Sequence, residues 1–383
     1  MIDYQEYEDK VIQYRRHLHQ NPEPSFKEYE TTKYIRDVLN SLEHCEVVEL
    51  TETGTIGVFN KGGNKKIGLR ADIDALPIQE ERTDLDFMSQ HDGIMHACGH
   101  DVHTAVLLGA AHYFNDHANE LTNEIHCIFQ HAEELIPGGA RELVETGYFE
   151  GFDFIYGHHI WATLPLGYID IKSGPASANS DLYQIEIQGR GGHASQPNKT
   201  IDPLLIGSHF VNEIQSIVSR KVDPFEPVVV SNTVFLAGNV NGANVIPDKV
   251  TLAGSVRTTT AENREICKSQ IEKTIEYLCL ANGATHKIDY TIGYDAVYND
   301  EAHTQWVREI AESNYPGKVI SEPTMMGGED FSAYQQAAPC VYIFIGSGSE
   351  GFDYPHHHPK FGIDESSFKV AFEMFVNIAL SYK

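Results

Sequence analysis

A cysteine and three histidines stand within one stretch of eight residues, His96-Ala97-Cys98-Gly99-His100-Asp101-Val102-His103. An apolar run at residues 104–114 follows this stretch and is predicted to be a helix. A thiolate and a neutral imidazole two residues apart can bind one metal ion from a loop that enters a helix, and the helix N-terminus favours the ionised sulfur. Cys98 and His100 are therefore the first candidates for a metal site.

Three more groups of metal-binding side chains follow in the chain: Glu133-Glu134, His158-His159 and His356-His357-His358. Adjacent glutamates at the end of a strand point in different directions, so one can bind a metal while the other faces a substrate. The triple histidine is internal and bounded by prolines, unlike a terminal purification tag. Taken singly, each group is more typical of an exposed turn or of structural histidines. Four ligand-rich loops that each follow a strand favour a metal site, because open α/β sheets collect their sites at strand ends.

The elements that must position these loops alternate between helices and strands. Hydrophobic periodicity predicts, outside the middle of the chain, helices at 4–19, 26–42, 104–114, 301–313 and 365–381, and strands at 55–59, 66–70, 124–129 and 341–345. This alternation indicates an α/β domain whose central mixed sheet is covered on both faces.

The middle of the chain has a pattern of its own. It predicts strands at 181–189, 228–236, 250–256 and 285–292, and helices at 202–220 and 261–280. The resulting order β-α-β-β-α-β is typical of a ferredoxin-like α+β unit. We therefore expect two domains: one formed by residues 1–179 and 293–383, and an inserted one formed by residues 180–292. Hinges are expected where the chain crosses between them, near 178–181 and 291–294.

The composition restricts the classes of partner. The chain of 383 residues has a formal net charge of −27, which argues against a nucleic-acid or anionic membrane surface and favours small-molecule partners. The N-terminus shows no basic and apolar leader, and no stretch approaches the roughly 20 apolar residues of a membrane span. The six cysteines are dispersed, as reduced core thiols are. A cytoplasmic location is the expectation.

Motifs spread along most of the chain resemble those of one enzyme family. They are Arg15-Arg16-His17-Leu18-His19 with Asn21-Pro22-Glu23, Arg70-Ala71-Asp72-Ile73-Asp74-Ala75-Leu76-Pro77, the stretch 96–103, Glu133-Glu134, Gly191-Gly192-His193-Ala194-Ser195, Asn244-Val245-Ile246-Pro247, Gly327-Gly328-Glu329-Asp330-Phe331, and His357 with Pro359 and Phe361. In this order and spacing the chain resembles the M20-type metallo-aminoacylases and carboxypeptidases, in particular the branch with hippurate hydrolases and auxin-conjugate hydrolases. The resemblance implies a zinc-peptidase-like catalytic domain with a dinuclear metal centre, and an inserted lid domain that usually also dimerises.

Carried over position by position, the resemblance implies a role for each motif. The implied metal ligands are Cys98, His100, Glu134, His159 and His357. Glu133 is the implied general base, and His193 on the lid is the implied donor to the oxyanion, often supplied by the partner subunit.

Further residues are expected to bind the substrate or to orient the ligands. Asn244 and Arg257 are candidates for gripping a substrate carboxylate, since a guanidinium fork matches that group. Asp72 and Asp74 are expected to orient metal ligands. Arg70 stands where more distant peptidase relatives carry a histidine ligand.

The chain departs from the family pattern at three histidines. His131 stands where proline is common, and His158 and His358 stand where other residues are common. A shift of the ligand by one residue stays open within 158–159 and within 356–358. The extra imidazoles are expected to support the ligands or to lie at the surface, and His96 and His103 are expected to be supporting or structural.

The predicted activity is removal of an acyl group, acetyl or similar, from the α-nitrogen of an amino acid, with two divalent metals that activate water. The mixed sulfur, nitrogen and oxygen ligands suit zinc or manganese, with cobalt and nickel as alternatives. A dipeptidase or carboxypeptidase, or a metal-binding module without catalysis, is the rival hypothesis, and N-acetyl-diaminopimelate is one open substrate. A homodimer through the lid is expected, with a tetramer as the alternative.

Overall fold

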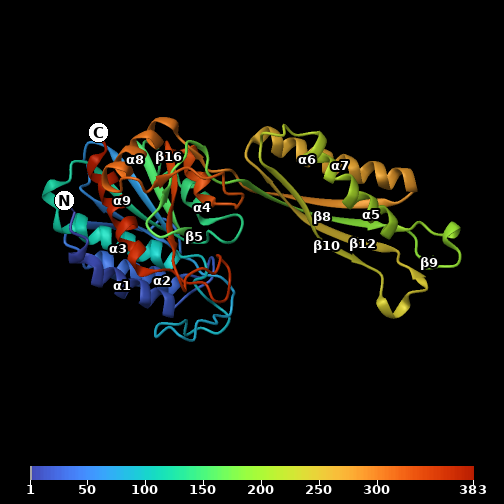
Figure 1. Cartoon of the computed structure of the whole chain (residues 1–383), viewed down its shortest axis with the longest axis horizontal. Coiled ribbons are helices and arrows are strands. Elements are labelled where there is room, and N and C mark those ends of the chain that lie inside the picture. The colour runs from blue at the N-terminus through green and yellow to red at the C-terminus, as the bar shows by residue number, and fades with distance from the viewer. Residues whose placement is uncertain (1) are drawn as a thin grey trace. The chain divides into compact units, whose positions relative to one another are not determined.

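The computed structural model describes residues 2–383, and these form two compact units (Figure 1). The larger unit comprises the chain up to Ala176 together with Val297–Pro323 and Asp330–Lys383. The smaller unit comprises Ser177–Ala296 and the short segment Thr324–Glu329. The short segment lies outside the inserted region that the sequence patterns delimit. Among the described residues, no helix is both long and apolar enough to span a membrane.

The larger unit is built on a mixed sheet of eight strands. In sheet order these are β1 (Cys45–Val48), β2 (Thr55–Phe59), β4 (Glu124–Gln130), β3 (Lys66–Asp72), β5 (Phe154–Pro165), β16 (Cys340–Gly348), β6 (Ile169–Asp170) and β15 (Val319–Ile320). The four central strands, from β4 to β16, run parallel. Parallel neighbours bring their carboxyl ends to one edge of the sheet. The expected mixed α/β sheet is thereby confirmed.

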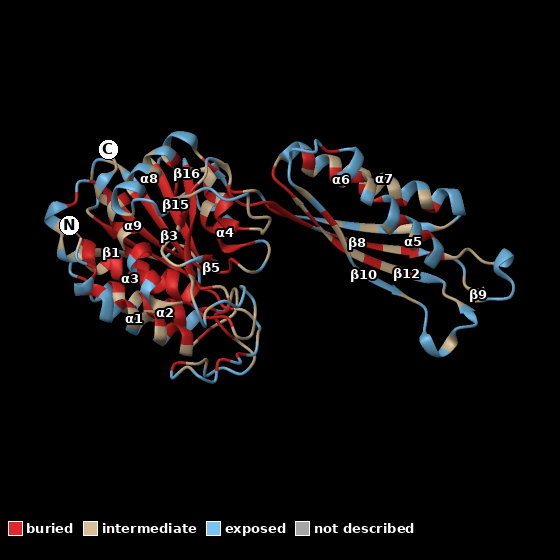
Figure 2. Cartoon of the chain, viewed as in Figure 1, coloured by how far each residue is buried: buried red, intermediate tan, exposed pale blue. Residues whose placement is uncertain are grey.

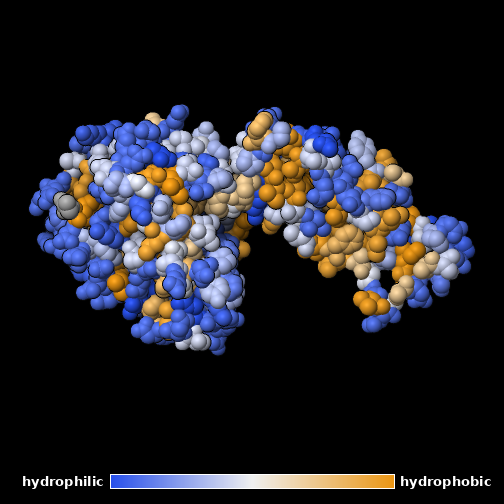
Figure 3. All heavy atoms as spheres, viewed as in Figure 1, coloured by the Kyte–Doolittle hydropathy of each residue, from blue (hydrophilic) through white to orange (hydrophobic). Residues whose placement is uncertain are grey.

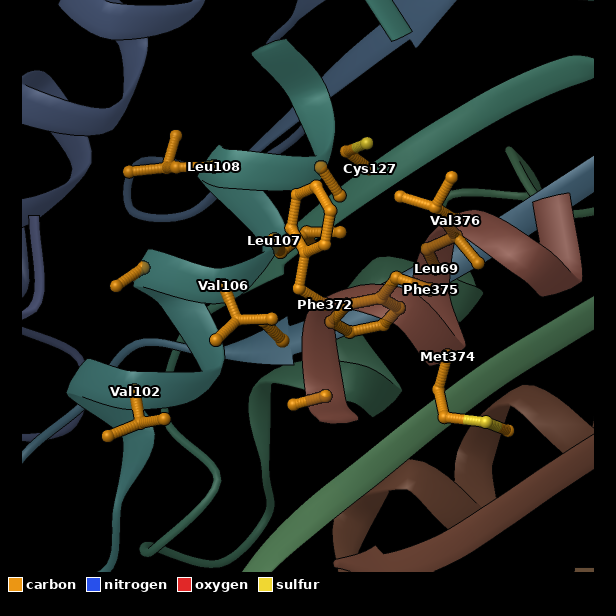
Figure 4. Close-up of a cluster of buried hydrophobic side chains, with 14 of the residues drawn as sticks. Leu69, Val102, Val106, Leu107, Leu108, Cys127, Phe372, Met374, Phe375 and Val376 are labelled. Carbon is orange, nitrogen blue, oxygen red and sulfur yellow. The ribbon is translucent and has the colours of Figure 1, made fainter. Parts of the chain in front are cut away.

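Helices and short turns cover both faces of this sheet. The helices are α1 (Gln5–Gln20), α2 (Tyr29–Asn40), α3 (His100–Asp116), α4 (Gly139–Glu145), α8 (Glu301–Asn314) and α9 (Phe368–Ser381). On one face, apolar side chains of α3 and α9 meet Leu69 of β3 in the main core (Figure 4). On the other face, Arg70 contacts Asp330 of the 3-10 helix η4 (Asp330–Gln336). The alternation along β3 therefore separates an apolar core from a polar layer.

Helix α3 is buried along almost its whole length, in contrast to α1, which is exposed on one side (Figure 2). Its sequence is apolar all round, as a helix packed between a sheet and other helices requires. Gly109 allows α1 to approach closely, because a Cβ there would lie 2.4 Å from Val11 Cγ2. Gly99 precedes the helix with φ of 101°, a conformation that glycine adopts without strain. The helix that carries the first metal candidates is thus held firmly in the core.

The smaller unit has the predicted ferredoxin-like order. Its elements are β8 (Asn179–Gln188), α5 (Pro203–Glu213), α6 (Gln215–Arg220), β10 (Val228–Ala237), β12 (Lys249–Thr258), α7 (Ala261–Asn282) and β13 (Thr285–Tyr294). The sheet order is β10-β12-β8-β13, and all neighbours are antiparallel. The single helix predicted at 202–220 is two helices that meet at Ile214. The short strands β9 (Gly192–His193) and β11 (Val245–Ile246) pair beyond one end of the sheet.

Candidate metal centre

The chain segments that follow the central parallel strands bring the metal-binding side chains together. Asp72 ends β3 and Asp74 follows it, Glu133 and Glu134 follow β4, and His159 lies within β5. Cys98 and His100 join them from the start of α3. The loop after β16 is attached to this start, since the His357 backbone N–H donates to the Ala97 carbonyl at 2.8 Å.

The donor atoms of the five predicted ligands form one connected cluster. Those of Cys98, Glu134 and His357 lie within 4.8 Å of one another, and so do those of His100, Glu133 and Glu134. The His159 Nε2 atom lies 3.5 Å from Cys98 Sγ. Glu134 belongs to two of these groups, so its carboxylate is placed to serve two adjacent ions. Two groups that share one carboxylate suit a dinuclear centre.

The backbone sets the tautomers of two histidines so that a lone pair faces the cluster. His159 Nδ1 donates a hydrogen bond to the Ile160 carbonyl at 2.7 Å, which leaves the lone pair of Nε2 available to a metal. His100 Nδ1 donates to the carbonyl and side chain of Asp74 at 3.0 and 3.1 Å. The buried His100 Nε2 accepts no hydrogen bond from the described residues and lies 4.0 Å from Glu134 Oε1. Both rings therefore have the form that metal-binding histidines need.

Two neighbouring histidines have both ring nitrogens bonded to protein. His103 Nδ1 donates to Asp72 at 2.6 Å, and its Nε2 accepts from the Ile160 N–H at 2.9 Å. His356 Nδ1 donates to the Cys98 carbonyl at 3.2 Å, and its Nε2 accepts from the Ala162 N–H at 3.1 Å. Neither ring keeps a lone pair for a metal. Within 356–358 the geometry favours His357, whose Nε2 lies 3.2 Å from Glu134 Oε1.

The other extra histidines contact parts of the protein other than the five predicted ligands. His158 is on the opposite side of β5 from His159, where its ring packs on Phe375 with centroids 4.2 Å apart. His358 Nδ1 accepts from the Lys360 N–H at 3.0 Å in a surface loop. His131 Nε2 lies 3.0 Å from Glu142 Oε2. The buried His96 has no hydrogen-bond partner among residues 2–383. None of these four histidines belongs to a group of potential metal ligands in the described part of the chain.

The carboxylates of the cluster favour positive charge at their centre. Burial and the carboxylates of Glu134, Glu133 and Asp72 raise the pKa of Cys98 well above its ordinary value. Burial alone would lower the pKa of His100, but Asp72, Asp74 and Glu134 raise it to about 10. A cation at the centre relieves both effects, because it stabilises the thiolate and neutralises the carboxylates. The buried His100 Nε2, which has no hydrogen-bond partner among the described residues, completes the fit of this donor set to divalent metal ions.

The residues behind the ligands form a bonded layer. Asp74 Oδ2 accepts from the Glu134 N–H at 3.0 Å, so Asp74 contacts two predicted ligands at once. The Arg70 guanidinium donates to Asp72 at 2.6 Å, to Gln130 at 2.8 Å and to Asp330 at 2.8 Å. At the position of the relatives' histidine ligand this chain therefore has a cation that holds the supporting carboxylates.

The smaller unit separates the predicted substrate-binding residues. His193 and Asn244 lie together where β9 pairs with β11, and the Ala194 N–H donates to the Asn244 carbonyl at 2.9 Å. Arg257 lies near the other end of β12, paired with Ser180. Arg257 is eight residue steps along the strand from Lys249, a span of roughly 26 Å at 3.3 Å per residue. Within one smaller unit, Arg257 and the β9–β11 pair therefore lie toward opposite ends of the sheet, and the assignment of Asn244 and Arg257 to one substrate carboxylate stays a prediction.

Two buried carboxylates near the centre received no role from the sequence. Asp330 accepts from Arg70, Gln130 and the Ala140 N–H, and Glu28 accepts from the Ala132 N–H beside the glutamate pair. Asp330 lies in the family motif at residues 327–331, and this motif is a signal that could have marked it as a candidate. Glu28 carries none, because a glutamate before a helix is an ordinary surface residue in most sequences.

Comparisons with known proteins show the family of this chain. The profile of peptidase family M20/M25/M40 matches residues 68–381. An N-acyl-L-amino acid amidohydrolase of Geobacillus stearothermophilus is 43% identical over 76% of this chain and 78% of its own length. An N-acetylcysteine deacetylase of Bacillus subtilis (strain 168) is 38% identical over 97% of this chain and 96% of its own length. Thermostable carboxypeptidase 2 of Saccharolobus solfataricus is also 38% identical, over 96% and 94%.

A solved structure extends the likeness to three dimensions. The YXEP protein of Bacillus subtilis, described as a dinuclear metal binding peptidase from the M20 family, is 34% identical to this chain with a TM-score of 0.83. The similarity covers 98% of both chains. The fold and the family expected from the sequence are thereby confirmed.

Proposed function

Because this chain belongs to peptidase family M20/M25/M40, we propose that it is a metal-dependent amidohydrolase that removes an acetyl or similar acyl group from the α-nitrogen of amino acids. The observation that carries the proposal is the cluster of metal-binding donor atoms that includes the carboxylate of Glu133. The relatives named for acyl-amino-acid and N-acetylcysteine hydrolysis support the substrate class. The ligands we assign are Cys98, His100, Glu134, His159 and His357.

Two divalent ions held by these ligands would supply Lewis-acid chemistry, because they lower the pKa of water and polarise the scissile carbonyl. Glu133 takes a proton from the attacking water at its carboxylate and delivers it to the leaving amine. It is suited to this role because it lies within the cluster and is almost fully buried. Asp74 holds the His100 ring and the Glu134 backbone in place. Zinc or manganese suits the mixed donors, with cobalt and nickel as alternatives.

We assign the oxyanion contact to His193 and the substrate carboxylate contact to Arg257, assisted by Asn244. The imidazole of His193 is exposed, and its Nδ1 accepts from the Ser195 N–H at 3.1 Å, which leaves Nε2–H as a donor. Burial lowers the pKa of Arg257, and its Nη1 has no hydrogen-bond partner among the described residues. A half-buried guanidinium with a buried and unbonded Nη1 is suited to a carboxylate.

We also propose a homodimer through the smaller unit, with a tetramer as the alternative, and the positions of Asn244 and Arg257 support this proposal. Because Arg257 and the β9–β11 pair beside Asn244 lie toward opposite ends of the sheet, we infer that two copies share the contact with one carboxylate. β10 is an edge strand with exposed Val229, Phe235 and Leu236, and apolar side chains gather on the visible face of this unit (Figure 3). An apolar edge strand is suited to pairing with a second copy. Six free cysteines favour a reducing compartment such as the cytoplasm.

The first test is metal analysis with activity measured after chelation and after re-addition of zinc, manganese, cobalt or nickel. We expect two ions per chain and loss of activity on chelation. An active protein without metal would contradict the proposal.

The second test replaces the general base. Glu133→Gln should lower kcat by about 10²- to 10⁴-fold with an unchanged metal content, because the amide cannot accept the proton. Glu145→Gln, an exposed glutamate in α4, is the control and should behave as the wild type. Wild-type turnover by Glu133→Gln would disprove the assigned role and would leave a metal-binding module without this catalysis as the better description.

A peptidase is the second candidate, favoured by the relative named as a carboxypeptidase. The same centre can cleave a peptide bond, since the chemistry of the two amides is alike. Comparing turnover of N-acetyl amino acids, including N-acetyl-diaminopimelate, with that of dipeptides separates the two. Rapid dipeptide cleavage without deacylation would overturn the amidohydrolase proposal.

A further inference from the structure

Glu28 is a buried carboxylate that the mechanism above does not use. It lies at the start of α2 and is fully buried in the larger unit. Its Oε1 accepts two backbone hydrogen bonds, from the Phe26 N–H at 3.0 Å and from the Ala132 N–H at 2.8 Å. Its Oε2 has no hydrogen-bond partner among the described residues. One oxygen atom thus joins two chain segments that are 104 residues apart.

Both of the residues that donate to Glu28 have left-handed backbones. Phe26 has φ of 63° and Ala132 has φ of 51°, and neither is glycine. A residue with a Cβ adopts this conformation at a cost, so the surrounding contacts must hold it there. The Ala132 carbonyl is also bonded, because it accepts from the Gly139 N–H at 3.0 Å. The Glu28 carboxylate and Gly139 therefore fix both sides of the strained residue.

Ala132 decides where the two functional glutamates point. The strand β4 ends at Gln130, and the left-handed turn at Ala132 comes directly before Glu133 and Glu134. After this turn the Glu134 N–H meets Asp74 Oδ2 at 3.0 Å, and both glutamate side chains enter the ligand cluster. An extended Ala132 would rotate the following backbone and redirect both carboxylates.

We propose that Glu28 is a positioning residue: its carboxyl oxygen holds Ala132 in the left-handed conformation and so aims Glu133 and Glu134 at the metal centre. The kinetic part of this inference depends on the function proposed above, whereas the metal-binding part does not. Burial and the nearby Asp74 raise the pKa of Glu28 to about 7. A neutral carboxyl group accepts through its carbonyl oxygen as an amide does, so glutamine is the conservative replacement.

Four variants test the proposal. Glu28→Ala removes the acceptor, and we expect kcat to fall by about 10- to 100-fold with KM changed little, because a small displacement of catalytic groups costs this much. Its affinity for metal, measured by calorimetry of the metal-free protein with zinc, should fall about 10-fold or more. Glu28→Gln should keep wild-type values for both. Glu30→Ala, an exposed glutamate on the same helix, is the matched control.

The fourth variant separates positioning from general stability. Adding Ala132→Gly to Glu28→Ala should recover most of the lost kcat and metal affinity, because glycine adopts a positive φ without strain. If Glu28→Ala does not fold, this double variant carries the test and must fold and bind two ions. Wild-type kcat and affinity in Glu28→Ala, equal losses in Glu28→Gln, or no recovery in the double variant would each overturn the proposal. A wild-type protein that binds metal without hydrolysing amides would refute only the proposed function.

Discussion

Replacing Arg70 tests whether the centre depends on the layer behind its ligands. The guanidinium is almost fully buried, at 1% exposure, and makes charge-assisted hydrogen bonds to Asp72 and Asp330 and a third bond to Gln130. In Arg70→Met the side chain keeps much of its volume but leaves two carboxylates buried without their cation. Breaking a buried pair in this way costs about 3–5 kcal/mol.

We therefore expect Arg70→Met to lower the unfolding free energy by about 3–5 kcal/mol, and the melting temperature of the larger unit by about 6–20 °C at 2–4 °C per kcal/mol. Urea titration followed by circular dichroism measures the first quantity, and calorimetry the second. Metal affinity should also fall, since Asp72 bonds His103 and lies 3.7 Å from His100 Nε2.

The matched control is Arg16→Met. Arg16 makes two hydrogen bonds of 3.0 Å to Glu365, but its side chain is 41% exposed. An exposed pair contributes at most about 1 kcal/mol. If Arg70→Met loses no more stability than Arg16→Met, the reasoning from burial is wrong.

Three further predictions concern single positions. His159→Leu should lose bound metal, whereas His158→Leu should keep it. His158→Leu should also be at least as stable as the wild type, because an apolar group replaces a buried imidazole without hydrogen bonds to the described residues. Loss of metal from His158→Leu in metal analysis would contradict this assignment. Burial opposes ionisation of Asp101, but Arg15 and His19 hold its pKa far below the ordinary value. The contribution of Asp101 to folding stability is therefore complete above its pKa in the unfolded chain, near 4, and is lost as the pH falls below that value. In urea titrations from pH 6 to 3, the unfolding free energy of Asp101→Asn should fall less steeply than that of the wild type. An equally steep fall in both proteins would refute this prediction. Gly99→Ala should lower stability by about 1–3 kcal/mol, measured by urea titration, since its φ is 101° and a Cβ would lie 3.0 Å from Ile363; an unchanged value would show that this turn is not strained.

Much of the fold could be predicted from local patterns. The periodicity of β8, β10, β12 and β13 with the intervening helices identified the ferredoxin-like unit, because a half-buried strand alternates and a packed helix repeats every 3.6 residues. Very short strands such as β6 and β15 escaped prediction, since two residues carry no period. The break between α5 and α6 also escaped, because no proline or glycine marks Ile214.

The candidate site was predictable to the level of residue types and motifs. Cysteine, histidine and paired glutamates in a fixed order limit the chemistry, because few functions other than metal binding assemble these donors. Which of two adjacent histidines faces the cluster depends on the side of the strand and on the carbonyl that fixes the tautomer. That carbonyl comes from the fold, as the Ile160 carbonyl does for His159.

The sequence by itself determined the family, the two kinds of domain and the set of donor residues, because these follow from local periodicity and from chemistry that side chains carry wherever they lie. Only the tertiary structure decided that Arg70 is a buried cation, that Arg257 pairs with Ser180 at the far end of β12 from Lys249, and that Glu28 accepts a hydrogen bond from the Ala132 N–H. The physical reason is that each of these depends on contacts between residues distant in the chain. The free energy of a buried charge or a strained backbone is set by such neighbours, and the residue itself does not reveal them.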